Sequence, residues 1–274
     1  MTAEMKEKKN AREQYIIEHL RLHYNECVEH YGVDKVWATM LYGSQNYGLD
    51  TPDSDIDTKT LLIPSPRDVI LGTKMVSTDL QISDGGLSNV KDYRAMFQNY
   101  LKGNINFVET LFTKYARVNM SLCEWFIALR RERDLIANCQ PQKLIHMAAG
   151  MANQKYVAFE KPFESKKEVL AKYGYDPKQL HHLCRLKFFI NDYCLNEDFE
   201  HALTPPEEAF DFLYDLKARP LSYERAVALK NKTMEQIDNA VVWADAHLPK
   251  DNGYEKAKKF LDDLSVEFFY ASLN

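Results

Sequence analysis

Residues 41–57 read Leu-Tyr-Gly-Ser-Gln-Asn-Tyr-Gly-Leu-Asp-Thr-Pro-Asp-Ser-Asp-Ile-Asp and contain the clearest motif in the chain. The pair Gly43-Ser44 ends a β-prone apolar run, and the pair Asp55 and Asp57 opens a second, alternating run. This order predicts two strands joined by a loop. A glycine-serine bend follows the first strand, and two carboxylates stand at the start of the second.

The other elements follow from hydrophobic periodicity and from the glycines and prolines that interrupt it. In the first part of the chain we expect helices over residues 3–31, 67–71 and 92–101, and strands over residues 36–42, 55–63, 74–82 and 87–91. Long helical patterns then dominate, over residues 122–138, 141–159, 177–195, 205–216, 222–247 and 254–273.

These patterns predict an α+β protein with a small mixed sheet flanked by helices and an all-helical C-terminal domain. Seven of the ten glycines lie at or before Gly103, so the glycine content falls after the first part of the chain. We therefore expect a first domain over residues 1–118 and a helical domain over residues 119–274.

Composition narrows the functional classes. The net charge of −5 gives no global basic field, so any contact with nucleic acid requires a local patch. Five cysteines without a Cys-x-x-Cys pair indicate reduced thiols and not a disulfide framework or zinc knuckle. No apolar run approaches the roughly 20 residues that span a bilayer, and the charged first ten residues do not resemble a signal peptide. We expect a cytoplasmic protein without a membrane partner.

Asp55 and Asp57 are candidate metal ligands. Side chains two apart in a strand project from the same face, with Cα atoms about 6–7 Å apart. Two carboxylates at this spacing suit Mg²⁺, which takes its other ligands from water and substrate phosphates. Ions held in this way stabilise the attacking and leaving oxygens of an in-line displacement. The same two residues also fit a solvated acidic turn, because aspartate-rich turns are common.

Gly43 and Ser44 are candidate phosphate-binding residues. Glycine lets the backbone approach phosphate oxygens, and a serine that caps a following helix adds its hydroxyl and the helix N-terminus. A plain strand-to-helix turn is the alternative. Gly48 is followed by Leu49-Asp50 and not by Lys-Ser/Thr, which excludes a P-loop. The bend and the aspartate pair together are more specific than either alone.

A basic stripe lies far downstream. Lys178, His182 and Arg185 are spaced i, i+4 and i+7 on a helix predicted to begin at Asp176-Pro177. Arginine suits bidentate phosphate contacts and lysine suits point-charge pairing, so the stripe is a candidate triphosphate contact. A solvated basic face, or a core histidine at His182, remains the alternative.

The arrangement of Gly43-Ser44 and Asp55-Ile56-Asp57 resembles the DNA polymerase β-like nucleotidyltransferase superfamily. Residues 42–57, 97–113 and 173–185 are similar to its RlaP-type branch, which is associated with RNA repair in some bacteria. The resemblance runs from about residue 36 to 195 and implies a nucleotidyltransferase core followed by a helical domain.

The resemblance also implies site residues and a reaction. It places Mg²⁺ or Mn²⁺ at Asp55 and Asp57 and the triphosphate of an NTP, with ATP expected, at Gly43-Ser44. It places Lys178, His182 and Arg185 near the site. The implied reaction transfers a nucleoside monophosphate to an acceptor hydroxyl, such as the 3′ end of an RNA or tRNA, and releases pyrophosphate.

Asn89 departs from the family pattern. Members carry a third carboxylate on a later strand, and the resemblance places Asn89 at that position. Asparagine offers a carbonyl oxygen to a metal but cannot act as a base. Two readings follow: an active enzyme in which Asp84 or Asp79 compensates, or a nucleotide-binding module with weakened catalysis. A nucleotidyltransferase that modifies a partner protein, and a helix-rich interaction protein with a vestigial motif, are further alternatives.

Overall fold

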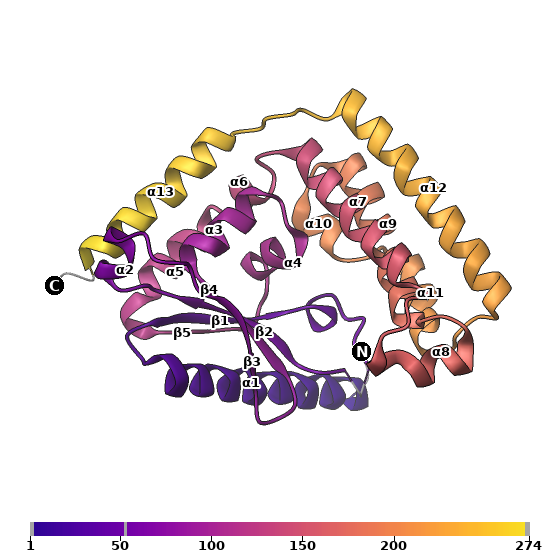
Figure 1. Ribbon diagram of the computed structural model, residues 1–274, viewed down its shortest axis with the longest axis horizontal. Coiled ribbons are helices and arrows are strands. Elements are labelled where there is room, and N and C mark those ends of the chain that lie inside the picture. Colours follow the sequence, from indigo (N-terminus) through magenta and orange to yellow (C-terminus); the bar gives the residue numbers. More distant parts are fainter. Residues whose placement is uncertain (1–2, 52–53, 272–274) are drawn as a thin grey trace. The chain divides into compact units, whose positions relative to one another are not determined.

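The structure is a computed structural model that describes residues 3–51 and 54–271 (Figure 1). It is a mixed α/β protein with one sheet and a helical C-terminal region, so the predicted fold class is confirmed. The chain forms two compact units. Unit 1 comprises Met1–Leu101, Asn106–Ile136 and Glu255–Asn274, and unit 2 comprises Lys102–Ile105 and Ala137–Tyr254. This grouping differs from the expected boundary at residue 118 in two ways. Residues 119–136 and 255–274 group with the sheet, and residues 102–105 group with unit 2.

Five strands of the described chain form one mixed sheet in the order β3-β4-β2-β1-β5. β1 pairs antiparallel with β2 and β5, β2 pairs parallel with β4, and β4 pairs antiparallel with β3. The strands are β1 (Val36–Tyr42), β2 (Asp57–Leu62), β3 (Ser77–Gln81), β4 (Leu87–Asp92) and β5 (Ala116–Val118). The sequence did not predict β5, because three residues are too few for a periodic pattern.

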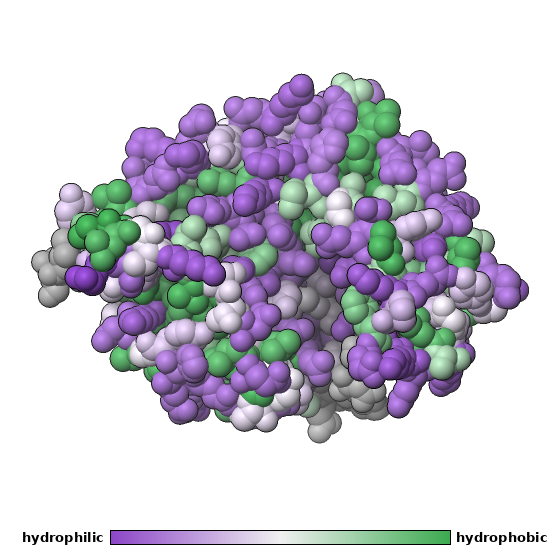
Figure 2. Space-filling view, in the orientation of Figure 1, coloured by the Kyte–Doolittle hydropathy of each residue, from purple (hydrophilic) through white to green (hydrophobic). Residues whose placement is uncertain are grey.

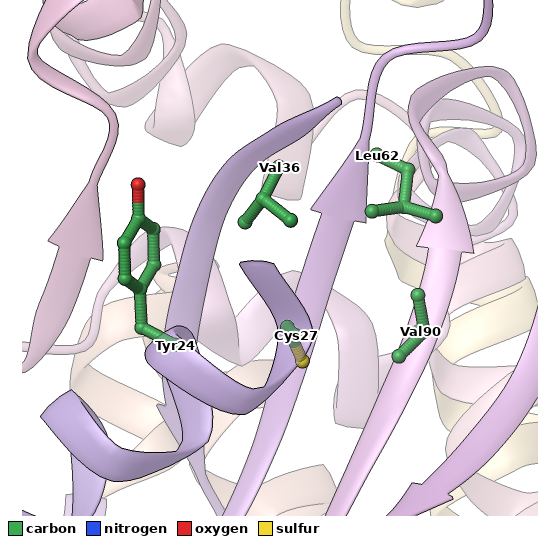
Figure 3. Packing of buried hydrophobic residues seen from close by; sticks show 5 residues of the cluster. All are labelled: Tyr24, Cys27, Val36, Leu62 and Val90. Carbon is green, nitrogen blue, oxygen red and sulfur yellow. The ribbon is translucent and has the colours of Figure 1, made fainter. Parts of the chain in front are cut away.

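Helix α1 (Ala3–Tyr31) covers one face of this sheet (Figure 1). Its Tyr24 and Cys27 pack with one apolar residue from each of three strands: Val36, Leu62 and Val90 (Figure 3). Side chains alternate between the two faces of a strand. Because Leu62 of β2 contacts α1, the odd-numbered residues of β2 project from the opposite face.

The remaining helices of the sheet region include one from the C-terminal end of the chain. They are α2 (Pro66–Ile70), α3 (Tyr93–Leu101), α4 (Ile105–Val108), α5 (Cys123–Arg131), α6 (Arg133–Ala137) and α13 (Tyr254–Ala271). The predicted helix over 122–138 is divided at Glu132 into α5 and α6. Leu273, in the predicted last helix, lies outside the described residues. Phe268 of α13 packs against Trp37 of β1, with ring centroids 4.4 Å apart.

Unit 2 is helical and is organised around α9, which contacts α7, α10, α11 and α12. Proline stands in the first turn of α7 and α9, as predicted, where its missing N–H costs no hydrogen bond. The helices are α7 (Pro141–Ala158), α8 (Lys167–Tyr173), α9 (Pro177–Asn196), α10 (Phe199–Leu203), α11 (Glu207–Ala218) and α12 (Tyr223–His247). Short 3₁₀ turns cover Ser44–Asn46 (η1), Glu109–Leu111 (η2), Met120–Leu122 (η3) and Glu164–Lys166 (η4).

The surface in Figure 2 is mainly hydrophilic, with hydrophobic residues scattered among polar ones. Among the described residues, no helix combines the length and the apolar character that crossing a bilayer requires.

Candidate functional site

The sheet register brings the glycine-serine bend beside the aspartate pair. Tyr42, the last residue of β1, is the Cα partner of Asp57, the first residue of β2. Gly43 follows directly, with φ 90° and ψ −156°, a conformation that is open essentially only to glycine. A Cβ built on Gly43 would meet no atom within 4 Å, so the backbone of the bend borders open space.

Side-chain hydrogen bonds hold the bend against its neighbours. The Gln45 amide donates to the backbone carbonyl of Asp55 over 2.9 Å, which ties the turn after Ser44 to the aspartate pair. The Gly43 N–H donates to Oε1 of Glu109 over 2.9 Å. The helix expected after Ser44 is only the three-residue turn η1, so its helix dipole is small. Phosphate binding would therefore depend on the bend itself.

Asp55 and Asp57 lie at the same end of the sheet but in different surroundings. Ile56 between them packs with Ile16 and Leu41 on the α1 side, and Thr58 contacts His23 of α1. Asp57 therefore projects from the face opposite α1. Asp55 lies just before the β2 ladder, is exposed and lines a pocket with Tyr15 and His19 of α1, so the expected projection of both carboxylates from one face of a strand is not seen.

No group of three or more His, Cys, Asp or Glu side chains in the described ranges 3–51 and 54–271 is placed to hold a metal ion. The proposed Mg²⁺ ligands Asp55 and Asp57 fit this, because magnesium at sites of this kind takes most of its ligands from phosphate oxygens and water. A metal at these two residues stays a prediction.

Lys59 is an unexpected buried charge on the same face as Asp57. Its side chain is 4% exposed, and its ammonium lies 3.7 Å from the Tyr42 ring centroid and 4.2 Å from that of Phe107. Burial lowers the pKa of Lys59 to about 8, against the opposing effect of the Glu109 carboxylate. Neither Lys59 nor Glu109 was predicted as a site residue. Their signals were a lysine inside a threonine-rich strand and a glutamate inside an apolar run.

Asn89 lies next to Lys59 in the sheet, since the two are Cα partners across β2 and β4. Its amide donates to Oδ1 of Asp79 over 2.6 Å. Asn89 itself is neutral, but a carboxylate from β3 lies against its amide.

Asp84, the other compensating candidate, lies in a different place. It lines a pocket of about 160 Å³ together with Asp55 and with Tyr15 and His19 of α1. Its carboxylate lies 3.1 Å from Nε2 of the buried His23. Burial lowers the pKa of His23, while Asp84 acts in the opposite direction. The structure thus brings Asp84 beside the aspartate motif across a wide gap in the sequence.

The predicted basic stripe belongs to a larger basic cluster within unit 2. On α9, Lys178 is exposed, His182 is half-buried and Arg185 is only 5% exposed. Burial and the charges of Lys178 and Arg185 lower the pKa of Lys155 on α7. Burial, followed by the charges of His181 and Arg185, lowers the pKa of His182 well below its ordinary value. Lys155 was not predicted as part of this cluster, because it lies on another helix and its spacing gives no signal.

The chain matches no family model and no curated protein.

Proposed function

We propose that the protein is a metal-dependent nucleotidyltransferase that moves a nucleoside monophosphate from an NTP, with ATP expected, to an acceptor hydroxyl. The observation that supports this most is that the bend and the aspartate pair lie at the same end of the sheet. The Tyr42–Asp57 register places Gly43 beside β2, and the Gln45 amide binds the backbone of Asp55. The glycine-serine bend is thereby a neighbour of both aspartates, which supports a role for the three together.

Each part of the chain has a distinct task in this proposal. The Ser44 hydroxyl binds phosphate oxygens, and the open space beside Gly43, whose own N–H donates to Glu109, admits them. Asp55 and Asp57 would hold Mg²⁺, which neutralises charge on the phosphates when it is bound. The acceptor oxygen attacks the α-phosphorus, and pyrophosphate leaves. An RNA 3′ end as acceptor follows from the family resemblance.

The first test removes both carboxylates. With α-labelled ATP, Mg²⁺ and separate RNA, protein and small-molecule fractions of a cell extract, the wild-type protein should label one fraction. The variant Asp55→Ala/Asp57→Ala should not. The control is Asp262→Ala/Asp263→Ala, which removes two aspartates from surface ion pairs on α13. Equal labelling by the Asp55/Asp57 variant would reject the assignment, and the labelled fraction identifies the class of acceptor.

A nucleotide-binding module with weak turnover is a second candidate, and the neutral Asn89 favours it. Calorimetry separates the two functions, because a module binds ATP with Mg²⁺ and labels no acceptor. The complementary variant exchanges two side chains, Asn89→Asp/Asp79→Asn. It moves the carboxylate to the family position while an amide still faces it, whereas Asn89→Asp alone would place two carboxylates side by side. A large gain in labelling indicates that the wild-type site has lost activity because of Asn89. No gain indicates that another residue acts as the third carboxylate.

A further inference from the structure

A chain of three side chains fixes the carboxylate of Asp84. His23 is fully buried, and its Nδ1 lies 2.9 Å from the Thr58 hydroxyl while its Nε2 lies 3.1 Å from Oδ2 of Asp84. A carboxylate only accepts, so Nε2 carries the hydrogen and donates to Asp84. Nδ1 then accepts from the Thr58 hydroxyl. The imidazole is thereby held in one tautomer and one orientation.

Gly86 completes the support from the other side. Its N–H donates to Oδ1 of Asp84 over 2.9 Å. A Cβ at this position would stand 2.5 Å from the Ile56 carbonyl oxygen and 2.9 Å from the His23 ring. Only glycine allows the β3–β4 turn to approach β2 and α1 this closely. The turn therefore holds the Asp84 side chain at 13% exposure.

The Asp84 carboxylate can still accept hydrogen bonds from a molecule in the pocket. An ionised carboxylate has about four acceptor positions, and His23 and Gly86 each occupy one. His19 adds a more distant contact, with its Nε2 3.9 Å from Oδ2. Asp55 and Tyr15 line the same pocket. The pocket thus joins a proposed metal ligand to a second, fixed hydrogen-bond acceptor.

We propose that this pocket receives the hydroxyl of the acceptor and that Asp84 is the base that takes its proton. This rests on the nucleotidyltransferase function proposed above. As the acceptor oxygen forms its bond to the α-phosphorus, its proton passes to Asp84. The bond between the α-phosphorus and its bridging oxygen breaks, and pyrophosphate leaves with the electron pair. His23 is a positioning residue that acts through Asp84.

Asp79 is less suited to this role. It accepts the Asn89 amide and lies on an exposed strand of the sheet. Asp84 is instead oriented by a buried histidine and a backbone N–H, and it shares a pocket with Asp55. The base is therefore supplied from the β3–β4 turn and not from the Asn89 position on β4.

The test uses the full chain with α-labelled ATP, Mg²⁺ and the extract fraction that the wild-type protein labels. Asp84→Asn should slow single-turnover label transfer by about 10²–10⁴-fold, the usual contribution of a general base. Its affinity for ATP with Mg²⁺, measured by calorimetry, should be unchanged. The control is Asp251→Asn, because Asp251 also accepts backbone N–H groups in a turn, from Gly253 and Tyr254.

The His23 variants separate positioning from folding. His23→Gln keeps a side-chain N–H for Asp84, and His23→Leu does not. If His23 positions the base, His23→Leu should slow transfer as much as Asp84→Asn does, and His23→Gln should keep part of the rate. Both His23 variants should lower the melting temperature by a similar amount. Asp84→Asn/His23→Leu should transfer no more slowly than Asp84→Asn, because the two residues act as one unit.

Two results would overturn the inference, and they are distinguishable. If Asp84→Asn transfers label at the wild-type rate, the inference fails and the nucleotidyltransferase function stands. If the wild-type protein labels no fraction, the proposed function fails and the inference falls with it.

Discussion

Gly86 is the glycine whose missing side chain matters most for packing at the candidate site. The gap that it leaves is filled by the Ile56 carbonyl and the His23 ring, so the β3–β4 turn can close on α1. This closure carries Asp84 to the pocket. The arrangement of Asp84, His23 and the pocket therefore requires glycine, with no Cβ, at position 86.

Gly86→Ala should lower the free energy of unfolding by about 1–3 kcal/mol, because its Cβ overlaps backbone as well as a side chain. Urea unfolding followed by circular dichroism measures the change. Gly150→Ala is the control, since Gly150 lies within α7 and a Cβ there meets nothing within 4 Å. That variant should be up to about 1 kcal/mol more stable, because alanine favours helix. Unchanged stability of Gly86→Ala would contradict the packing described here.

Helix α9 carries two adjacent histidines, and the buried one, His181, links it to α11. His181 Nδ1 donates to the Leu213 carbonyl over 2.8 Å. Burial lowers the pKa of His181 to about 4; the nearby charges of Arg185, Lys217 and Lys178 add to this, and the Leu213 carbonyl opposes it. The folded helix therefore holds a neutral imidazole at a pH where the unfolded chain binds a proton.

The sign of the pH effect follows from this difference. Between pH 6.5 and about 4 the unfolded state binds more protons at His181, so the free energy of unfolding falls as the pH falls. His181→Asn keeps an N–H donor for Leu213 and removes the titrating ring, so it should lose less stability over this range than the wild-type protein. Urea unfolding at several pH values measures it. The control is His247→Asn, an exposed histidine whose Nδ1 also lies 2.8 Å from a helical carbonyl, that of Trp243. Parallel pH profiles for wild type and His181→Asn would contradict the expectation.

Segments that lie far apart in the sequence share one core in unit 1. Trp37 of β1 is fully buried and packs against Phe97, Phe126 and Phe268. Phe268 comes from α13, which follows all of unit 2 in the chain. Unit 1 is therefore discontinuous in the sequence, and its stability depends on the last helix.

Phe268→Ala should lower the free energy of unfolding of unit 1 by about 3–5 kcal/mol, the usual cost of removing a buried phenyl ring. Fluorescence of the tryptophans during urea unfolding reports it, since Phe268 contacts Trp37 and Trp125. Val266→Ala is the control on the same helix, because Val266 is 53% exposed. A similar, small effect of both substitutions would show that α13 contributes little to this core.

Local patterns predicted much of the fold. Helix α1, the strands β1 to β4 and the helix starts at Pro141 and Pro177 depend on nearby residues, so periodicity and capping signals indicated them. The break at Glu132 and the strand β5 had no such signal. The grouping of α13 with the sheet depends on contacts such as Trp37 with Phe268, which no local pattern contains.

The candidate site was likewise predictable only where its residues lie close together in the sequence. The bend at Gly43 and the pair Asp55 and Asp57 form a contiguous motif, so the sequence indicated them together. His23 and Asp84 lie 61 residues apart, and neither carries a local signal that points to the other. Only the packing of α1 on the sheet brings them together.

The late position of α13 affects how the protein is made. A ribosome adds about 5–20 residues per second, so on the order of ten seconds pass while all of unit 2 is synthesised before Phe268 emerges. During that time the nascent sheet lacks the phenyl ring that packs on Trp37. The newly made N-terminal segment therefore lacks this packing contact until α13 has been synthesised.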